Sequence, residues 1–273
     1  MKMFVIDVAK CVGCRSCEIV CKDEHVDNDW SPIALPQPDT GQHWVRVEEK
    51  ERGQVPKVTV AYTPIMCQHC KNAPCMAVAK DGAVYRRDDG LVIVDPMKAR
   101  GQKAIVDACP YGAMFWNDEQ NVAQKCTGCA HLLDDGWTVP RCVDACAHDV
   151  LRFGDEEEFA EELKDAEILR PDLNTQPSVV YLNLPKRFIG GEIADLEADE
   201  VIIGAKVVLT NKETGETRET TSDWFGDFWF KQIEAAEYTI SVEAEGYLPR
   251  TVKDFISTVD KDLNVGTIAM YKA

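Results

Sequence analysis

Four cysteines near the start of the chain have the spacing of an iron–sulfur ligand run. Cys11, Cys14, Cys17 and Cys21 follow the pattern C-x2-C-x2-C-x3-C. In a run with this spacing, three thiolates bind one [4Fe–4S] cluster and the fourth binds a different cluster. The pattern therefore predicts a second cysteine run elsewhere in the chain.

The second run lies over a hundred residues further on and has the spacing C-x2-C-x12-C-x3-C. It contains Cys126, Cys129, Cys142 and Cys146. If the last cysteine of each run joins the other run, two complete ligand sets result. The first predicted set is Cys11, Cys14, Cys17 and Cys146. The second predicted set is Cys21, Cys126, Cys129 and Cys142.

The middle of the chain has the same pair of runs with half of the cysteines missing. The cysteines that remain are Cys67, Cys70, Cys75 and Cys109. The positions where the spacing requires a further cysteine hold Ala79, Ala99, Gln102 and Ile105. If the last position of each run again belongs to the cluster of the other run, which we call crossed ligation, these four positions form the whole ligand set of one cluster. The four remaining cysteines then form the whole ligand set of another cluster. The sequence therefore predicts a scaffold for four clusters from which one has been deleted, leaving three [4Fe–4S] clusters.

Disulfide bonds and structural zinc account for the cysteines less well. A disulfide framework does not suit four cysteines that lie between residues 11 and 21, because they cannot all find unstrained partners. Structural zinc suits the pair Cys126 and Cys129, but it does not account for the three-step run that begins at Cys11. Iron–sulfur ligation accounts for all twelve cysteines together.

The composition limits the possible partners. The 273 residues include 30 Lys and Arg and 47 Asp and Glu, which gives a formal charge of −17. Nucleic acid is disfavoured, because phosphate contacts need clustered Lys and Arg. No apolar run approaches the roughly 20 residues that span a bilayer, and the first residues lack a signal cleavage pattern. We therefore expect a cytoplasmic protein with no membrane span and no nucleic-acid partner.

Every cysteine lies in the first part of the chain, and we expect residues 1–195 to form a double ferredoxin-like iron–sulfur region. Residues 66–112 would be a nested insert that has lost one cluster, because the flanking cysteine runs must meet in space. A strand within residues 4–14 should enter the first ligand loop, and a helix beginning near residue 16 should carry Cys21.

Shorter patterns predict further elements of this region. Residues 91–98 and 113–120 have the β-branched or aromatic character of strands. The acidic segment 154–167 predicts a short surface helix capped by Asp155. The segment 169–192 is rich in Pro and Asn, which predicts an extended C-terminal arm that crosses the core or a partner.

Residues 196–273 have a different pattern, in which apolar and polar residues alternate between turns rich in Gly and Asn. We expect strands at 205–210, 217–222, 227–231, 238–244, 249–255 and 264–270. Short strands at regular intervals are typical of an antiparallel β-sandwich. The predicted fold class is therefore α+β, with two nested bacterial-ferredoxin-like units followed by a small all-β sandwich. The sandwich contains no His and no Cys, so we expect a structural or docking module.

Several residues beside the cysteines have two interpretations. His25, His69 and His131 could ligate iron, but four thiolates per cluster suffice, which favours hydrogen bonding or packing. Lys125 could raise the potential of a neighbouring cluster or remain a solvated surface lysine. No nucleophile–base set, phosphate loop or paired carboxylate suggests a catalytic site, so the chemistry available to this chain is electron transfer.

Four segments carry a family resemblance: CVGCRSCEIVCKDEH, CQHCKNAPC, ACPYGA and KCTGCAHLLDDGWTVPRCVDAC. They resemble the iron–sulfur subunits of the dimethyl sulfoxide reductase family of molybdopterin enzymes, and the likeness extends through about the first 190 residues. The resemblance implies a large catalytic partner subunit that carries molybdenum with bis(molybdopterin guanine dinucleotide), in a heterodimer or a multiple of it. The segments GAKVVLTNKETGE, GDFWF and YTISVEAEGY resemble the transthyretin-like or Cna-B-type sandwiches.

The missing cluster, the lack of a membrane tail and the added sandwich together resemble the small subunits of transhydroxylases within this family. The complex would then move a hydroxyl group between phenols at molybdenum with no net redox change, and substrate residues would lie on the large subunit. One alternative is a relay subunit of a soluble molybdenum reductase or dehydrogenase that passes electrons to an external carrier. Another is a zinc-stabilised scaffold without electron transfer.

Overall fold

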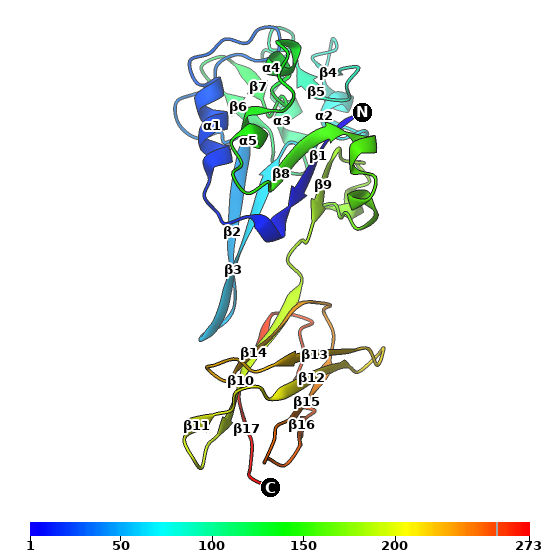
Figure 1. Ribbon diagram of the computed structural model, residues 1–273. Coiled ribbons are helices and arrows are strands. Elements are labelled where there is room, and N and C mark those ends of the chain that lie inside the picture. Colours follow the sequence, from blue (N-terminus) through cyan, green and yellow to red (C-terminus); the bar gives the residue numbers. More distant parts are fainter. Residues whose placement is uncertain (255) are drawn as a thin grey trace. The chain divides into compact units, whose positions relative to one another are not determined.

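A computed structural model describes residues 1–254 and 256–273 of the chain (Figure 1). The chain divides into two compact units. The first contains residues 1–49 and 62–184, and the second contains residues 50–61 and 185–273. The boundary was expected between residues 195 and 196. The second unit begins earlier, because the strand β10 (Arg187–Asp195) pairs with strands of the sandwich.

A three-stranded sheet in the order β8-β1-β9 joins the two ends of the first unit (Figure 1). The strand β1 (Lys2–Asp7) confirms the strand predicted before the first ligand loop. It lies antiparallel to β8 (Leu151–Asp155) and parallel to β9 (Val179–Leu182). Phe4, Val5 and Ile6 are almost fully buried, as expected of a continuous apolar strand covered on both faces.

The helix α1 (Ser16–His25) confirms the helix predicted to carry Cys21, and it follows the short 3₁₀ turn η1 (Val8–Lys10). Cys17 and Cys21 are four residues apart, so they lie on the same side of the helix. Both are buried against the core of the unit. The helix therefore presents one cysteine of each of two predicted ligand sets to the interior.

Short helices and two-stranded hairpins build the rest of the first unit. The hairpins are β4 (Val84–Arg86) with β5 (Val92–Val94), and β6 (Phe115–Asn117) with β7 (Val122–Gln124). The strands β5 and β6 confirm the two strands predicted beside the ligand loops. The helices are α2 (Pro74–Val78), α3 (Ala104–Asp107), α4 (Ala130–Asp134) and α5 (Arg141–Asp144). Within the described residues, no helix is long and apolar enough to span a membrane.

The acidic segment 154–167 does not form the single short helix that was expected. It contains two 3₁₀ turns, η2 (Glu156–Phe159) and η3 (Glu162–Lys164). The Asp155 carboxylate pairs with the Lys2 ammonium at 2.9 Å, while the Asp155 backbone N–H donates to the Glu158 carboxylate. The segment 169–192 contains the turn η4 (Pro171–Leu173), the strand β9 and the start of β10. The predicted arm is therefore partly a strand of the central sheet of the first unit.

Two four-stranded sheets form the second unit. The first contains β10, β11 (Glu200–Val201), β14 (Asp227–Ile233) and β17 (Leu263–Ala269). The second has the order β13-β12-β15-β16, with β12 (Lys206–Asn211), β13 (Thr217–Thr221), β15 (Tyr238–Glu243) and β16 (Arg250–Val252). All six predicted strands are present, although the last residue of the predicted segment 249–255 lies outside the described residues.

The prediction of a wholly antiparallel sandwich is wrong in one place, because β10 and β17 are parallel. These strands are far apart in sequence, so no hairpin turn fixes their relative direction. The two sheets enclose an apolar core that includes Ile193, Phe228 and Ile240. Alternate residues of β12 and β15 supply much of it, which is why the period-two pattern was visible in the sequence.

A long hairpin, β2 (Val45–Gln54) with β3 (Lys57–Met66), was not predicted. Its tip belongs to the second unit. There the Arg52 guanidinium donates to both carboxylate oxygens of Asp262, at 2.9 and 2.7 Å. The Lys57 ammonium pairs with the Asp227 carboxylate. Two ion pairs, whose side chains are little exposed to solvent, therefore join the hairpin tip to the sandwich.

Candidate iron–sulfur sites

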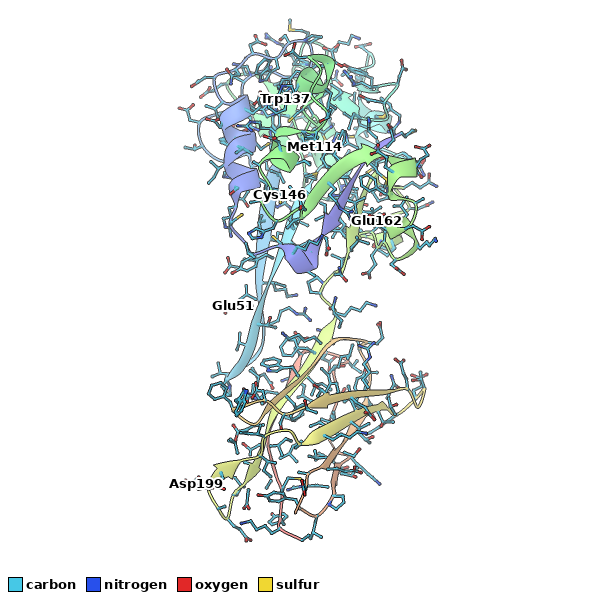
Figure 2. All side chains as sticks on the ribbon, in the orientation of Figure 1. Glu51, Met114, Trp137, Cys146, Glu162 and Asp199 are labelled. Carbon is cyan, nitrogen blue, oxygen red and sulfur yellow. The ribbon has the colours of Figure 1, made fainter. Side chains whose placement is uncertain are left out.

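The first site is a pocket lined by four predicted ligands: Cys11, Cys14, Cys17 and Cys146. Three elements bring them together: the loop after β1, the helix α1, and the turn that follows α5. Figure 2 labels Cys146 in this region of the first unit. The Cys17 side chain is buried, whereas Cys14 is exposed. This site therefore has one thiol at the surface.

Backbone N–H groups point toward the sulfurs of this first site. Burial raises the pKa of Cys11, while the Gly13 backbone donates a hydrogen bond to its sulfur. Burial also raises the pKa of Cys17 to about 12, with a further contribution from the Glu18 charge. Hydrogen bonds from the side chain and backbone of Ser16 lower the pKa of Cys14. The loop thus supplies donors suited to thiolate or sulfide sulfur.

The second site is another cavity, lined by the remaining cysteines of the middle region: Cys67, Cys70, Cys75 and Cys109. The lining also includes Pro74, Tyr111 and Met114, the last of which is labelled in Figure 2. Burial raises the pKa of Cys70 to about 12. Burial raises the pKa of Cys109 as well, while the Ala113 backbone donates to its sulfur.

The third group contains Cys21, Cys126, Cys129 and Cys142, all of which are buried. Burial raises the pKa of Cys21 far above its usual value, and the charges of Cys126 and Cys129 add to the effect. Burial likewise raises the pKa of Cys126 to about 11 and that of Cys129 to about 12. The Gly128 N–H donates to the Cys126 sulfur at 3.4 Å. These cysteines are close enough for their charges to interact, as the predicted set requires.

Cysteines of the third group lie near cysteines of each of the other two groups. Cys142, of the third group, lies close enough to Cys17 of the first site for their charges to interact. Cys126, also of the third group, interacts in the same way with Cys67 of the second site. The third group therefore neighbours each of the other two.

The chemistry of these sites fits [4Fe–4S] clusters. Each has four thiols, an apolar surrounding and backbone N–H donors directed at sulfur, which is the environment that holds and tunes such clusters. Within the described residues, no group of three or more His, Cys, Asp or Glu is arranged to hold a single metal ion. Ligation by the twelve cysteines remains a prediction.

The four positions that lack cysteine are filled by ordinary packing. Ala99 and Ile105 have no exposed surface, and Ala79 packs against the same apolar cluster. The Gln102 side chain accepts a hydrogen bond from the Lys80 N–H at 2.9 Å and donates to the Lys98 carbonyl at 2.8 Å. These four residues offer no thiolate.

Lys125 is buried, which excludes the solvated alternative considered from the sequence. Its ammonium donates to the carbonyls of Val92 and Cys126, the latter at 2.9 Å. The Lys125 charge reaches Cys75 and Cys109 as well as Cys126. The lysine therefore places a positive charge beside both the second site and the third group.

The three histidines near cysteines have different surroundings. His131 bonds the Glu24 carboxylate through Nε2 at 3.1 Å and stacks on Trp30. His25 packs against Trp44, and burial lowers the pKa of His25 to about 3. His69 lines the cavity of the second site. The sequence left the role of His69 open, because spacing alone does not show where a side chain lies.

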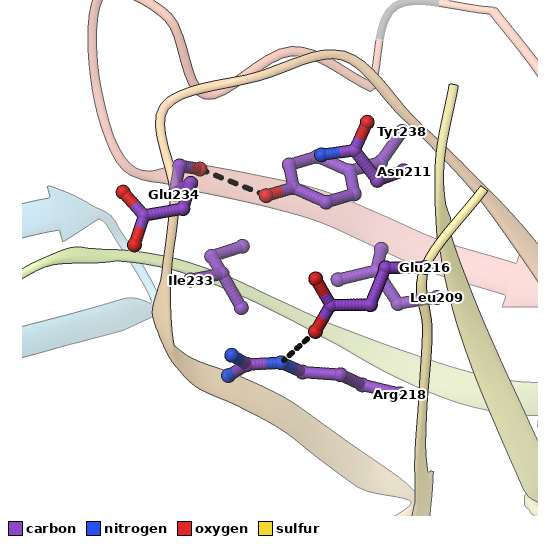
Figure 3. Close-up of a pocket in the computed structure, with 7 residues that line it drawn as sticks. All are labelled: Leu209, Asn211, Glu216, Arg218, Ile233, Glu234 and Tyr238. Atoms are coloured by element: carbon purple, nitrogen blue, oxygen red, sulfur yellow. Dashed lines mark hydrogen bonds and ion pairs between the residues drawn. The ribbon is translucent and has the colours of Figure 1, made fainter. Parts of the chain in front are cut away.

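A further pocket lies in the second unit (Figure 3). Its polar groups bond to one another. The Tyr238 hydroxyl donates to the Glu234 carbonyl at 2.9 Å, and Arg218 lies 3.8 Å from the Glu216 carboxylate. Its lining residues are Leu209, Asn211, Glu216, Arg218, Ile233, Glu234 and Tyr238.

Two family models match the chain. Residues 58–156 match a 4Fe-4S dicluster domain, and residues 189–271 match a carboxypeptidase regulatory-like domain. The first match covers the second site and most of the third group. The second match covers the sandwich almost from the start of β10.

Several relatives match over most of their length. The chain is 41% identical to the pyrogallol hydroxytransferase small subunit of Pelobacter acidigallici, covering 97% of this chain and 98% of the relative. It is 34% identical to a subunit of tetrathionate reductase from Salmonella typhimurium, covering 68% and 73%. It is 35% identical to a subunit of sulfite dehydrogenase from Allochromatium vinosum, covering 67% and 82%.

Proposed function

The chain belongs to the iron–sulfur electron-transfer subunits of the dimethyl sulfoxide reductase family of molybdoenzymes, and from this premise we propose that it serves a hydroxytransferase acting on pyrogallol. The observation that carries the proposal is the 41% identity to a pyrogallol hydroxytransferase small subunit across 97% of the chain. That match includes the sandwich, whereas the match to the tetrathionate reductase subunit covers 68% of the chain.

In this proposal, the twelve cysteines hold three [4Fe–4S] clusters as three crossed sets. Each cluster accepts or gives one electron with little rearrangement. The residues of the chain exclude water from most of the thiolates and direct backbone N–H groups at the sulfurs. The neighbour relations support an order with the Cys21 set in the middle. The exposure of Cys14 supports the Cys11 set as the end nearest the surface.

We further propose a catalytic partner subunit that carries molybdenum with bis(molybdopterin guanine dinucleotide) and the substrate residues. The chain itself would have no active site. A hydroxyl group would pass between phenols on the partner with no net redox change, so the clusters would carry no steady flow of electrons. The absence of a fourth ligand set agrees with a function in which few electrons pass along the clusters.

The second candidate is a relay subunit of a reductase or dehydrogenase that passes electrons to an external carrier. The similarity to the tetrathionate reductase and sulfite dehydrogenase subunits favours it. The exposed Cys14 would offer a surface point for electron exchange.

A turnover experiment separates these two functions. The chain is purified with its large partner subunit and incubated anaerobically with pyrogallol, with and without an electron-accepting dye. The hydroxytransferase proposal expects conversion to phloroglucinol in both samples, with no stoichiometric reduction of the dye. Dye reduction in proportion to product, or the absence of phloroglucinol, would instead support the relay function.

A further inference from the structure

His69 occupies a position that suits glycine. The first C-x-x-C step of each cysteine run reads CVGC at Cys11, CTGC at Cys126 and CQHC at Cys67. The residue before the second cysteine is Gly13 in the first and Gly128 in the second, and both have positive φ, 71° and 63°. His69 adopts the same left-handed region with φ 42°. A side chain at such a position is uncommon, and an observed outlier of this kind is a reason to look for a function.

Contacts on both sides fix the orientation of the His69 imidazole. The side chain is 1% exposed, and its ring stacks against Phe4 with centroids 6.3 Å apart. The Val92 backbone N–H donates to His69 Nδ1 at 3.0 Å. Because Nδ1 accepts this hydrogen bond, it must carry the lone pair, and the ring proton therefore lies on Nε2.

The Nε2–H group has no partner within the described part of the chain, although it is buried. A buried donor without an acceptor is costly and needs an explanation. His69 lines the same cavity as Cys67, Cys70, Cys75 and Cys109, where the proposed function places a [4Fe–4S] cluster. Cluster sulfide and thiolate sulfur are hydrogen-bond acceptors.

We propose that His69 Nε2–H donates a hydrogen bond to a sulfur of the cluster at the Cys67 site and raises the reduction potential of that cluster. The inference rests on the proposed iron–sulfur function and assigns His69 a positioning and tuning role, without ligation of iron. Reduction adds negative charge to the cluster sulfurs, so a donor bond strengthens in the reduced state. The proton remains on Nε2 throughout.

The test compares His69→Phe with His69→Gln in the intact complex. Phenylalanine keeps a ring for stacking on Phe4 and removes the donor, whereas the glutamine amide can restore an N–H near the position of Nε2. His131→Phe is the matched control, because it removes an imidazole that is only 7% exposed and lies two residues from Cys129 of the third group. Redox titration with dithionite, followed by electron paramagnetic resonance, measures the potential of each cluster. Iron content is measured on the same samples.

We expect one cluster of His69→Phe to become about tenfold harder to reduce, which for one electron is about 59 mV. His69→Gln should recover part of this shift, and His131→Phe should leave this cluster unchanged. A proton-sensitive resonance measurement should detect, besides the protons of the backbone N–H donors, one exchangeable proton near the reduced cluster in the wild type that is lost in His69→Phe.

Unchanged potentials with full iron in His69→Phe would overturn the inference, and so would an equal shift of all clusters. If His69→Phe loses iron, retention of the cluster and proton in His69→Gln supports the role, while loss of iron in both variants contradicts it. A wild type without iron would instead refute the proposed function itself, so the two failures are distinguishable.

Discussion

Replacing Cys21 by alanine should remove the cluster of the third group and leave the Cys11 site intact, although Cys21 lies in the same sequence run as Cys11 and on the same helix as Cys17. The reason is that the Cys21 thiol neighbours Cys126 and Cys129. The iron content should fall from about twelve to about eight per chain, since each cluster contains four irons.

Double variants make this prediction sharper, because two cysteines of one site act as a unit and those of different sites act independently. Cys21→Ala with Cys126→Ala should lose no more iron than either single change, leaving about eight irons. Cys21→Ala with Cys17→Ala should lose two clusters, leaving about four. If the Cys17 and Cys21 double variant instead keeps eight irons, ligation follows the sequence runs and the crossed sets are wrong.

Replacing Arg52 by methionine should destabilise the second unit by about 3–5 kcal/mol, because it leaves the Asp262 carboxylate buried without its cation. The two side chains are only 10% and 5% exposed, and Asp262 also accepts the Phe188 N–H at 3.1 Å. The free energy of unfolding of the intact chain, measured with a denaturant, gives the size of the loss.

A matched control for this ion pair lies on the same hairpin strand. Arg46 pairs with Glu48, but these side chains are 31% and 57% exposed. Arg46→Met should therefore cost less than about 1 kcal/mol, as is usual for exposed ion pairs. A double variant with Arg52→Met and Asp262→Asn should recover part of the loss. Equal effects of Arg46→Met and Arg52→Met would show that burial of the Arg52 pair contributes nothing.

The sequence predicted the elements whose patterns are local. The strands β12, β14 and β15 alternate apolar and polar residues, and α1 follows directly from the spacing of its cysteines and its flanking loop. The strand β1 is a short apolar run before a ligand loop. In each of these elements, the residues whose pattern allowed the prediction include the residues that are buried on its inner face.

Elements without a clear local pattern, or with partners far along the chain, were missed. The hairpin of β2 and β3 joins neighbouring segments, but β2 is mostly polar and lacks a regular alternation of apolar and polar residues. The parallel pairing of β10 with β17 has no local signal, because no turn joins these strands. The acidic segment 154–167 carries helix-forming residues but breaks into 3₁₀ turns, where Phe159 is buried beside Met3 and Val5.

For the candidate sites, too, local patterns could be predicted from the sequence and contacts between distant residues could not. Cysteine spacing predicted the three groups, because ligation imposes a pattern on the sequence itself. The structure shows how Ile105 and Gln102 are packed at two of the positions where the spacing lacks a cysteine. The orientation of the His69 side chain could not be predicted from the sequence, because it depends on the Val92 N–H and the Phe4 ring from distant parts of the first unit.

The number of clusters tests the proposed ligand sets most directly. Iron and acid-labile sulfide should be measured on the anaerobically purified complex, after subtraction of any cluster on the partner subunit, together with spectroscopic counting of the cubes. We predict about twelve irons and twelve sulfides per chain in three cubes. About sixteen irons in four cubes, or zinc in place of iron, would contradict the three crossed sets.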